Sequence, residues 1–358
     1  MQQKSVSPAY AAAELRAREH RDNHDFAEAA KSARKAAKIA GDEGDFSSWW
    51  TMTYFTAESL LADTDFEGCA ETASALMAEP QRISAPSRAQ VHILMAKAHQ
   101  GFGLLESAAS EAKAAVELTI DESDVDINVK ARQALIAALA DSGKLTDAWT
   151  QSKELASVIS DELDEQLAGK AYWVIGNVAF LCDKIEEGLR YHELASTTFS
   201  PARDLNIWAK FNKASAAMRL SASVADADTL RCIERAELAT DVIGGSVHDY
   251  MLLKLNRAHW SLLAGEHQAA IDILEDLCRV EDLLTPQRSG EACLLLGRAY
   301  AATDDKAKSR EWLLKSAHYF DAAGAPHRAQ QTRDFLRSEL GRGSFWSWLV
   351  RVTGFDRT

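Results

Sequence analysis

Three lysines recur at an interval of 40 residues, at Lys130, Lys170 and Lys210. Such a regular interval is typical of a repeated structural unit, in which equivalent side chains line up as a stripe along one surface. Stacked ammonium groups attract the carboxylates of an anionic segment. The alternative is that these lysines only solvate helix faces, as most lysines do, and the sequence alone leaves both interpretations open.

Motifs that usually mark catalytic sites are absent. The 358 residues contain no glycine-rich phosphate loop, HExxH zinc motif, nucleophile elbow or calcium-binding loop. His20 and His24 lie four residues apart and could hold a metal ion, but a helix end is expected between them. The cysteines show no CxxC or paired spacing, which favours buried thiols. They are Cys69, Cys182, Cys232, Cys278 and Cys293. We therefore expect no catalysis, no cofactor and no metal.

Short turns that resemble one another show which elements must carry the lysines. Eight turn segments each end in a small residue, and successive small residues are separated by 40, 39, 40, 40, 44, 38 and 39 positions. A second small residue usually stands twelve positions earlier, so two antiparallel helices can pack closely in every unit. The small residues that end the turns are Ala29, Cys69, Ala108, Ala148, Gly188, Cys232, Ala270 and Ser309.

The eighth unit carries the most specific pattern. Residues 294–300 read Leu-Leu-Leu-Gly-Arg-Ala-Tyr, and Ser309 occupies the small-residue site of the following helix. This pattern resembles the tetratricopeptide repeat, although the period is near 40 and the family's is about 34. Longer repeats of this kind resemble the regulatory domains of bacterial peptide-sensing regulators. The resemblance implies an all-α, right-handed solenoid of about eight helical hairpins that binds a peptide.

The tetratricopeptide pattern also implies which residues face the concave groove. They stand six and three residues before the small residue of each first helix, and one residue after it. The lysines among them would attract an acidic segment or a C-terminal carboxylate, Asn177 would bond to a peptide backbone, and Trp173 would anchor a side chain unless it is core. The candidate groove residues are Lys97, Lys130, Gln133, Lys170, Trp173, Asn177, Lys210 and Lys213.

The repeats are expected to form one solenoid over residues 1–324, with a slight joint at 79–86 between Pro80 and Pro86. Residues 325–358 are expected to form a capping helix pair, including an aromatic segment of the same domain. That segment contains Phe345, Trp346 and Trp348. It either seals the last hydrophobic layer or inserts into a partner groove or a membrane surface, with a homodimer as one further alternative.

Composition excludes several classes of protein. The chain has 40 Lys+Arg against 53 Asp+Glu, a net charge of −13, which disfavours direct binding to nucleic acid. No window has the roughly 18 apolar residues of a membrane span, and we expect a cytoplasmic protein. The predicted function is a peptide- or protein-binding regulatory or interaction protein. The alternatives are a constitutive scaffold or adaptor, or a non-catalytic subunit of a larger complex, including the sensor half of a split transcription regulator.

Overall fold

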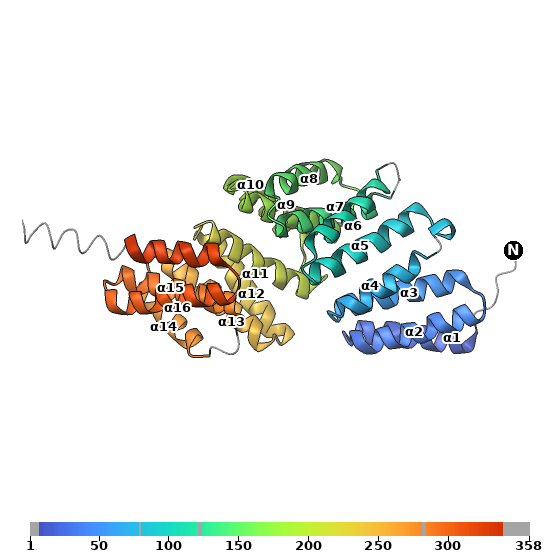
Figure 1. The fold of residues 1–358 in the computed structure, drawn as a ribbon, viewed down its shortest axis with the longest axis horizontal. Helices are drawn as coiled ribbons and strands as arrows, with labels where there is room; N and C mark the ends of the chain where they lie inside the picture. The colour runs from blue at the N-terminus through green and yellow to red at the C-terminus, as the bar shows by residue number, and fades with distance from the viewer. Residues whose placement is uncertain (1–6, 79, 121–123, 281–283, 339–358) are drawn as a thin grey trace, which may run out of the picture. The chain divides into compact units, whose positions relative to one another are not determined.

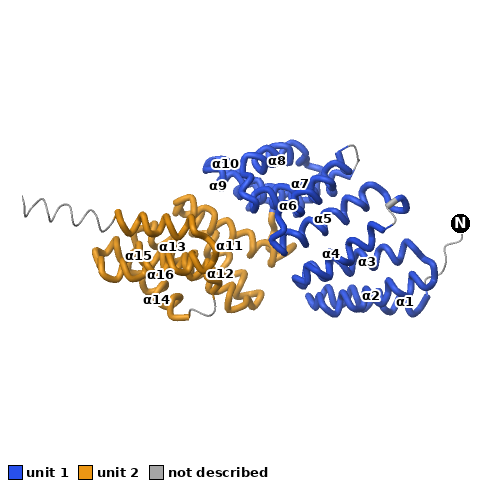
Figure 2. Tube along the Cα trace, in the orientation of Figure 1, with its two compact units in different colours: residues 1–198 blue, residues 199–358 orange. Residues whose placement is uncertain are grey.

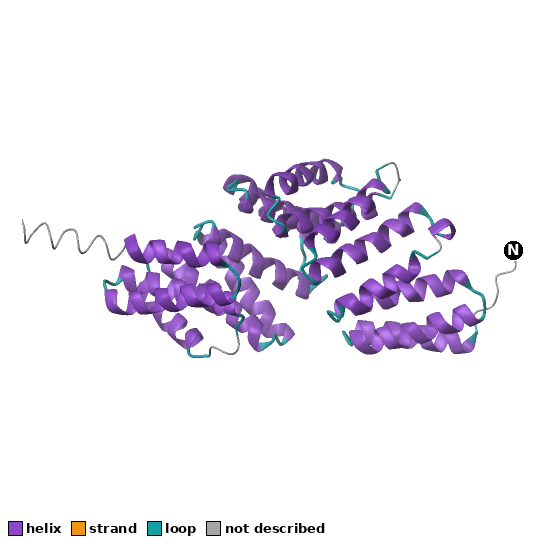
Figure 3. Ribbon diagram, viewed as in Figure 1, coloured by secondary structure: helices purple, strands orange, loops and turns teal. Residues whose placement is uncertain are grey.

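The computed structural model of the chain describes residues 7–78, 80–120, 124–280 and 284–338 (Figure 1). Within these ranges every regular element is a helix (Figure 3). Among the described residues, sixteen α-helices form eight consecutive hairpins, which confirms the predicted all-α class and the repeat of helical hairpins.

The first helices of the hairpins are α1 (Pro8–Asp22), α3 (Phe46–Ala62), α5 (Ala85–Gly101), α7 (Val125–Asp141), α9 (Glu165–Leu181), α11 (Leu205–Ser221), α13 (Val247–Leu263) and α15 (Pro286–Ala302). The second helices are α2 (Phe26–Asp42), α4 (Phe66–Leu76), α6 (Leu105–Glu117), α8 (Leu145–Val158), α10 (Ile185–Thr198), α12 (Ala227–Ile243), α14 (His267–Cys278) and α16 (Lys306–Ala322). A short 3₁₀ helix, η1 (Pro80–Arg82), lies in the segment where the joint is predicted, and residues 326–338 are also helical.

The hairpin turns share one backbone geometry. Each contains a residue with positive φ shortly before the second helix begins, and three of the eight are glycines, which adopt this conformation without strain. The eight residues are His24, Thr64, Gly103, Gly143, Asp183, Ser223, Gly265 and Asp304. Seven of the described turns span three residues, but the turn between α11 and α12 spans the five residues 222–226. The interval of 44 residues between Gly188 and Cys232 is four longer than the usual 40. Two of these four extra residues lie in the turn, and the other two lie at the start of α12.

Small residues bring the two helices of a hairpin into close contact, as predicted. A Cβ atom added to Gly297 in α15 would lie 2.7 Å from Leu313 Cγ in α16. In α2, Ala29 is completely buried, as is Ala17 in α1. No larger side chain fits at such sites without pushing the helices apart.

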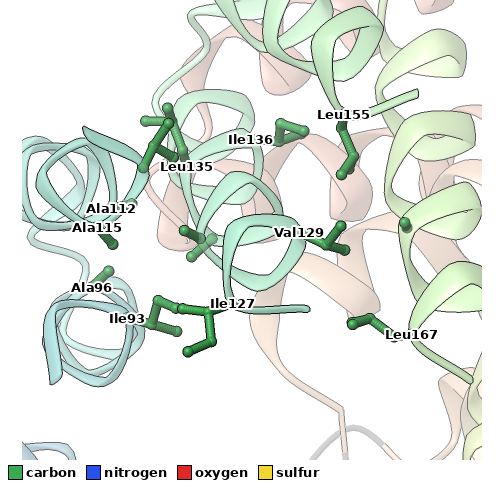
Figure 4. Packing of buried hydrophobic residues seen from close by; sticks show 14 of the residues in the cluster. Ile93, Ala96, Ala112, Ala115, Ile127, Val129, Leu135, Ile136, Leu155 and Leu167 are labelled. Carbon is green, nitrogen blue, oxygen red and sulfur yellow. The ribbon is translucent and has the colours of Figure 1, made fainter. Parts of the chain in front are cut away.

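The chain divides into two compact units, residues 1–198 and residues 199–358 (Figure 2). Unit 1 contains the first five hairpins, and its largest core cluster includes Ile93, Ile127 and Leu155 (Figure 4). Within unit 1, α3 packs on α5, α5 on α7 and α7 on α9, so these four first helices form one continuous layer. Unit 2 contains the other three hairpins, and α11 packs on α13 and α13 on α15. A single solenoid over both units stays a prediction.

Candidate binding site

Three of the predicted groove lysines lie on neighbouring helices of unit 1. Lys97 is on α5, Lys130 on α7 and Lys170 on α9, and each of these helices packs on the next. Lys97 and Lys130 are exposed and Lys170 is half-buried. None of the three has an ion-pair partner in the part of the chain that the structure describes. We call the surface formed by Lys97, Lys130 and Lys170 the lysine face.

Electrostatic coupling shows that these lysines share one environment. Protein atoms crowd the Lys97 amine and lower its pKa by desolvation, although the side chain still reaches solvent. Lys170 and Lys130 lower the pKa further because a neighbouring positive charge disfavours the ammonium form, while Glu58 opposes this effect.

A buried amide lies on the same helix as Lys130, one turn away. Gln133 on α7 is half-buried, and its Nε2 atom is shielded from solvent without a hydrogen-bond partner among the described residues. Leaving a buried donor unpaired usually costs free energy, so each such group requires an explanation. An acceptor on a bound ligand would satisfy it.

In the second hairpin, α3 has its small residue at Ala57. Tyr54, three residues before it, and Glu58, one residue after it, occupy two of the positions that the repeat pattern assigns to the groove. Arg21 donates to Glu58 from Nη1 at 2.9 Å, so this carboxylate is already paired. Tyr54 stacks on Trp50 with ring centroids 5.3 Å apart, and burial raises the pKa of its hydroxyl. The sequence analysis did not name Tyr54 and Glu58, although their register within the repeat could have identified them.

Asn177 already has an intramolecular partner. His192 on α10 is completely buried and donates from Nε2 to Asn177 Oδ1 at 3.1 Å. The amide NH₂ of Asn177 is therefore the part of this side chain left for a ligand. Trp173, one turn earlier on α9, is half-buried.

Lys210 and Lys213 lie on α11, which belongs to unit 2. The lysine face consists only of residues of unit 1 and does not include them. Together with Asp249 and Thr240 they line a cavity of about 80 Å³. Lys213 Nζ donates to Asp249 Oδ1 at 2.6 Å and lowers the pKa of that carboxyl to about 2, with help from Ser246. Lys213 thus ties α11 to the start of α13, and a role in binding stays a prediction.

Unit 2 has a basic cluster that the sequence analysis did not name. The pKa of His259 on α13 is lowered to about 4, chiefly by burial and also by the charges of Arg298 and Arg328, while Glu291 opposes the shift. Arg288 donates to Glu291 at 2.7 Å. Arg288 and Arg328 stand 40 residues apart, which is the interval that could have revealed them.

The remaining predictions concern the ends of the chain and metal binding. Phe345, Trp346 and Trp348 lie outside the described residues. The expected helix end between His20 and His24 is confirmed, because α1 ends at Asp22. Within the described ranges, no group of three or more His, Cys, Asp or Glu side chains is arranged to hold a metal ion. None of the described helices has the length and apolarity needed to cross a membrane.

Comparison with known proteins identifies the fold. No family model matches the chain, and no curated protein matches its sequence. Aspartyl phosphate phosphatase F from Bacillus subtilis aligns over 89% of this chain and 96% of its own, at 12% identity and a TM-score of 0.55. A Rap protein complexed with competence and sporulation factor aligns over 93% and 98%, at 10% identity and a TM-score of 0.53. In its fold, the chain is therefore a tetratricopeptide-like helical-repeat protein that resembles these two proteins.

Proposed function

We propose that the lysine face of unit 1 binds an acidic segment of a peptide or protein, and that the chain is a non-catalytic regulatory protein of the bacterial cytoplasm. One observation carries this proposal. Lys97, Lys130 and Lys170 are gathered without ion-pair partners among the described residues, in a protein of net charge −13.

Gathering like charges has an energetic cost that a ligand would relieve. Desolvation first, and then the charges of Lys170 and Lys130, disfavour the ammonium form of Lys97, as its lowered pKa records. A carboxylate between them replaces repulsion with attraction and favours the protonated form of Lys97. Functional sites often keep such strain in the unbound protein, whereas most structural charges are paired.

Neighbouring polar groups suit an extended peptide. The buried Nε2 of Gln133 and the NH₂ of Asn177 are donors that can meet backbone carbonyl oxygens of a ligand. Trp173 offers an aromatic surface for one side chain. The solved Rap protein with a similar fold is described in complex with competence and sporulation factor. That likeness supports a groove ligand by analogy of fold.

Charge removal with a matched control tests the proposal. The probe is a fluorescent peptide of alternating glutamate and alanine with a free carboxyl terminus, and affinity is measured by anisotropy at two salt concentrations. In the test variant, Lys97, Lys130 and Lys170 are changed to Gln. The control changes Lys35, Lys38 and Lys153 to Gln, which removes the same charge from exposed positions on the second helices α2 and α8.

The test variant is expected to lose at least about tenfold in affinity and most of the salt dependence, because three ammonium contacts are removed. The control is expected to bind almost like the native chain. Equal losses in the two variants, or a native chain that does not bind the acidic probe better than a glutamine-for-glutamate version, would overturn the proposal.

A further inference from the structure

Two cysteines on successive helices of unit 2 meet in its core. Cys278 is the last residue of α14 and Cys293 lies within α15, fifteen positions later. Their Sγ atoms are 3.9 Å apart, and the two residues are 9% and 3% exposed. Helices α14 and α15 pack on each other, so this contact joins the seventh hairpin to the eighth.

The distance is short enough for a disulfide to form with small movements. A disulfide places its sulfurs about 2.05 Å apart, and rotation about the Cα–Cβ bond of one cysteine moves its sulfur by more than the difference. The surroundings leave room for such a rotation. Both cysteines line a cavity of about 10 Å³ together with Ser289 and Tyr319, which is space for about one water-sized molecule.

The other buried cysteines lie in different surroundings. The sulfur of Cys232 is 3.9 Å from the hydroxyl oxygen of Ser215, which cannot form a disulfide. The pKa of the Cys69 thiol is raised to about 11, chiefly by burial and also by the nearby Asp65. A high pKa leaves little of the reactive thiolate. Cys232 is the better matched control, because it is a buried cysteine of the same unit whose neighbour is a hydroxyl group and not a second thiol.

We propose that Cys278 and Cys293 are an oxidative modification site, at which a peroxide converts the two thiols into an intramolecular disulfide. The Cys278 sulfur attacks one peroxide oxygen, the O–O bond breaks, and the departing hydroxide takes the thiol proton to give water and a sulfenic acid. The Cys293 sulfur then attacks the Cys278 sulfur, the S–O bond breaks, and a second water leaves. The two thiols lose two electrons and the peroxide gains them.

Cys278 takes the first step because it is the more exposed of the two. Cys293 then acts as the resolving thiol. The resulting bond would cross-link α14 to α15 and restrict any opening between the last two hairpins of unit 2. The site is independent of the lysine face, which belongs to unit 1.

Peptide mapping of the native chain tests this proposal directly. The full-length protein is reduced, freed of reductant, treated with hydrogen peroxide, alkylated, and digested without reduction. A peptide pair joined through Cys278 and Cys293 is expected, with an intact mass about 2 Da lower and full reversal by dithiothreitol. The oxidised protein is expected to unfold at a higher temperature than the reduced protein.

Three variants sharpen the test. Cys278→Ser and Cys293→Ala are each expected to abolish the mass loss and the thermal shift, whereas Cys232→Ala is expected to keep both. If a variant fails to fold, the presence or absence of cross-linked Cys278–Cys293 peptides in the oxidised native chain still shows whether the disulfide forms. The proposal is overturned if both thiols remain alkylatable after peroxide, if Cys278 stops at a sulfinic acid, or if either cysteine pairs elsewhere.

Discussion

A Cβ atom added to Gly176 in α9 would lie only 3.3 Å from the carbonyl oxygen of Gly188 in α10. These are the two small residues that the repeat places twelve positions apart in the fifth unit. The same added atom would lie 2.3 Å from Cδ2 of His192, whose ring is bonded to Asn177. The packing of this hairpin therefore also fixes the orientation of Asn177 beside the lysine face.

Replacing Gly176 with Ala is expected to destabilise the protein by about 1–3 kcal/mol, because the methyl group overlaps the His192 ring. Urea denaturation followed by circular dichroism measures the loss. In a His192→Ala background the same change should cost less, since the ring that it meets first is gone. Strictly additive effects of the two substitutions would contradict the assigned clash.

Replacing Lys97 with Met is expected to stabilise the fold and to weaken binding of the acidic peptide. Its pKa is lower in the folded state than in the unfolded state, so the charge on Lys97 opposes folding at neutral pH. The gain should stay below about 1 kcal/mol because solvent screens an exposed amine. Thermal unfolding should show the stability advantage of the variant shrinking as the pH rises through the folded pKa of Lys97, which lies below 10.5, and vanishing above 10.5, where the amine is neutral in both states.

Lys97→Arg serves as the control, since it keeps a positive charge in the same place. It should retain more affinity for the acidic peptide than Lys97→Met does. If Lys97→Met instead lowers the thermal midpoint and leaves binding intact, Lys97 is a packing residue and not part of a binding site.

Replacing Asp249 with Asn is expected to destabilise unit 2 by about 1 kcal/mol at neutral pH, because both the Lys213 pair and the cap with Ser246 are weakened. The pKa of Asp249 falls from 3.8 to about 2 on folding, so its contribution is complete above about pH 4. It is lost as the pH falls toward 2. Unfolding curves of the two proteins should therefore converge in acid. Ser246→Ala, which keeps the Lys213 pair, separates the two contributions.

The imidazole of His259 is expected to titrate near pH 4 in an NMR experiment. Because its folded pKa lies below the ordinary 6.5, the unfolded state takes up this proton first, and unit 2 loses stability as the pH falls from 6.5 toward 4. Arg298→Gln should raise the pKa of His259, since one repelling charge is removed. Arg310→Gln, at an exposed position on α16, should leave it unchanged. Equal titration in all three proteins would contradict the assigned coupling.

The architecture was predictable because each hairpin repeats the same local requirements. The interval of about 40 residues places a turn and a helix start in each unit and two small residues in most units, and prolines mark several starts, as at Pro8 and Pro286. These features act within a few residues of one another, so a single sequence records them. The division after residue 198 has no comparable local signal.

The candidate site was predictable only in part. The position of a residue within the repeat predicts the helix face that its side chain occupies. This rule assigned Lys97, Lys130 and Lys170 to the same face. It does not identify the partner on another helix. Asn177 bonds to His192 fifteen residues away, and Lys213 bonds to Asp249 thirty-six residues away. Such contacts depend on side-chain packing across hairpins, which the repeat leaves free to vary.

Lys97 also has a consequence for covalent chemistry. An amine reacts with acylating reagents only in its unprotonated form, and a lowered pKa enlarges that fraction at neutral pH. Because the side chain still reaches solvent, a succinimidyl ester supplied in small amount should acylate Lys97 ahead of the other lysines. A single dye could then be placed on the lysine face without introducing a cysteine.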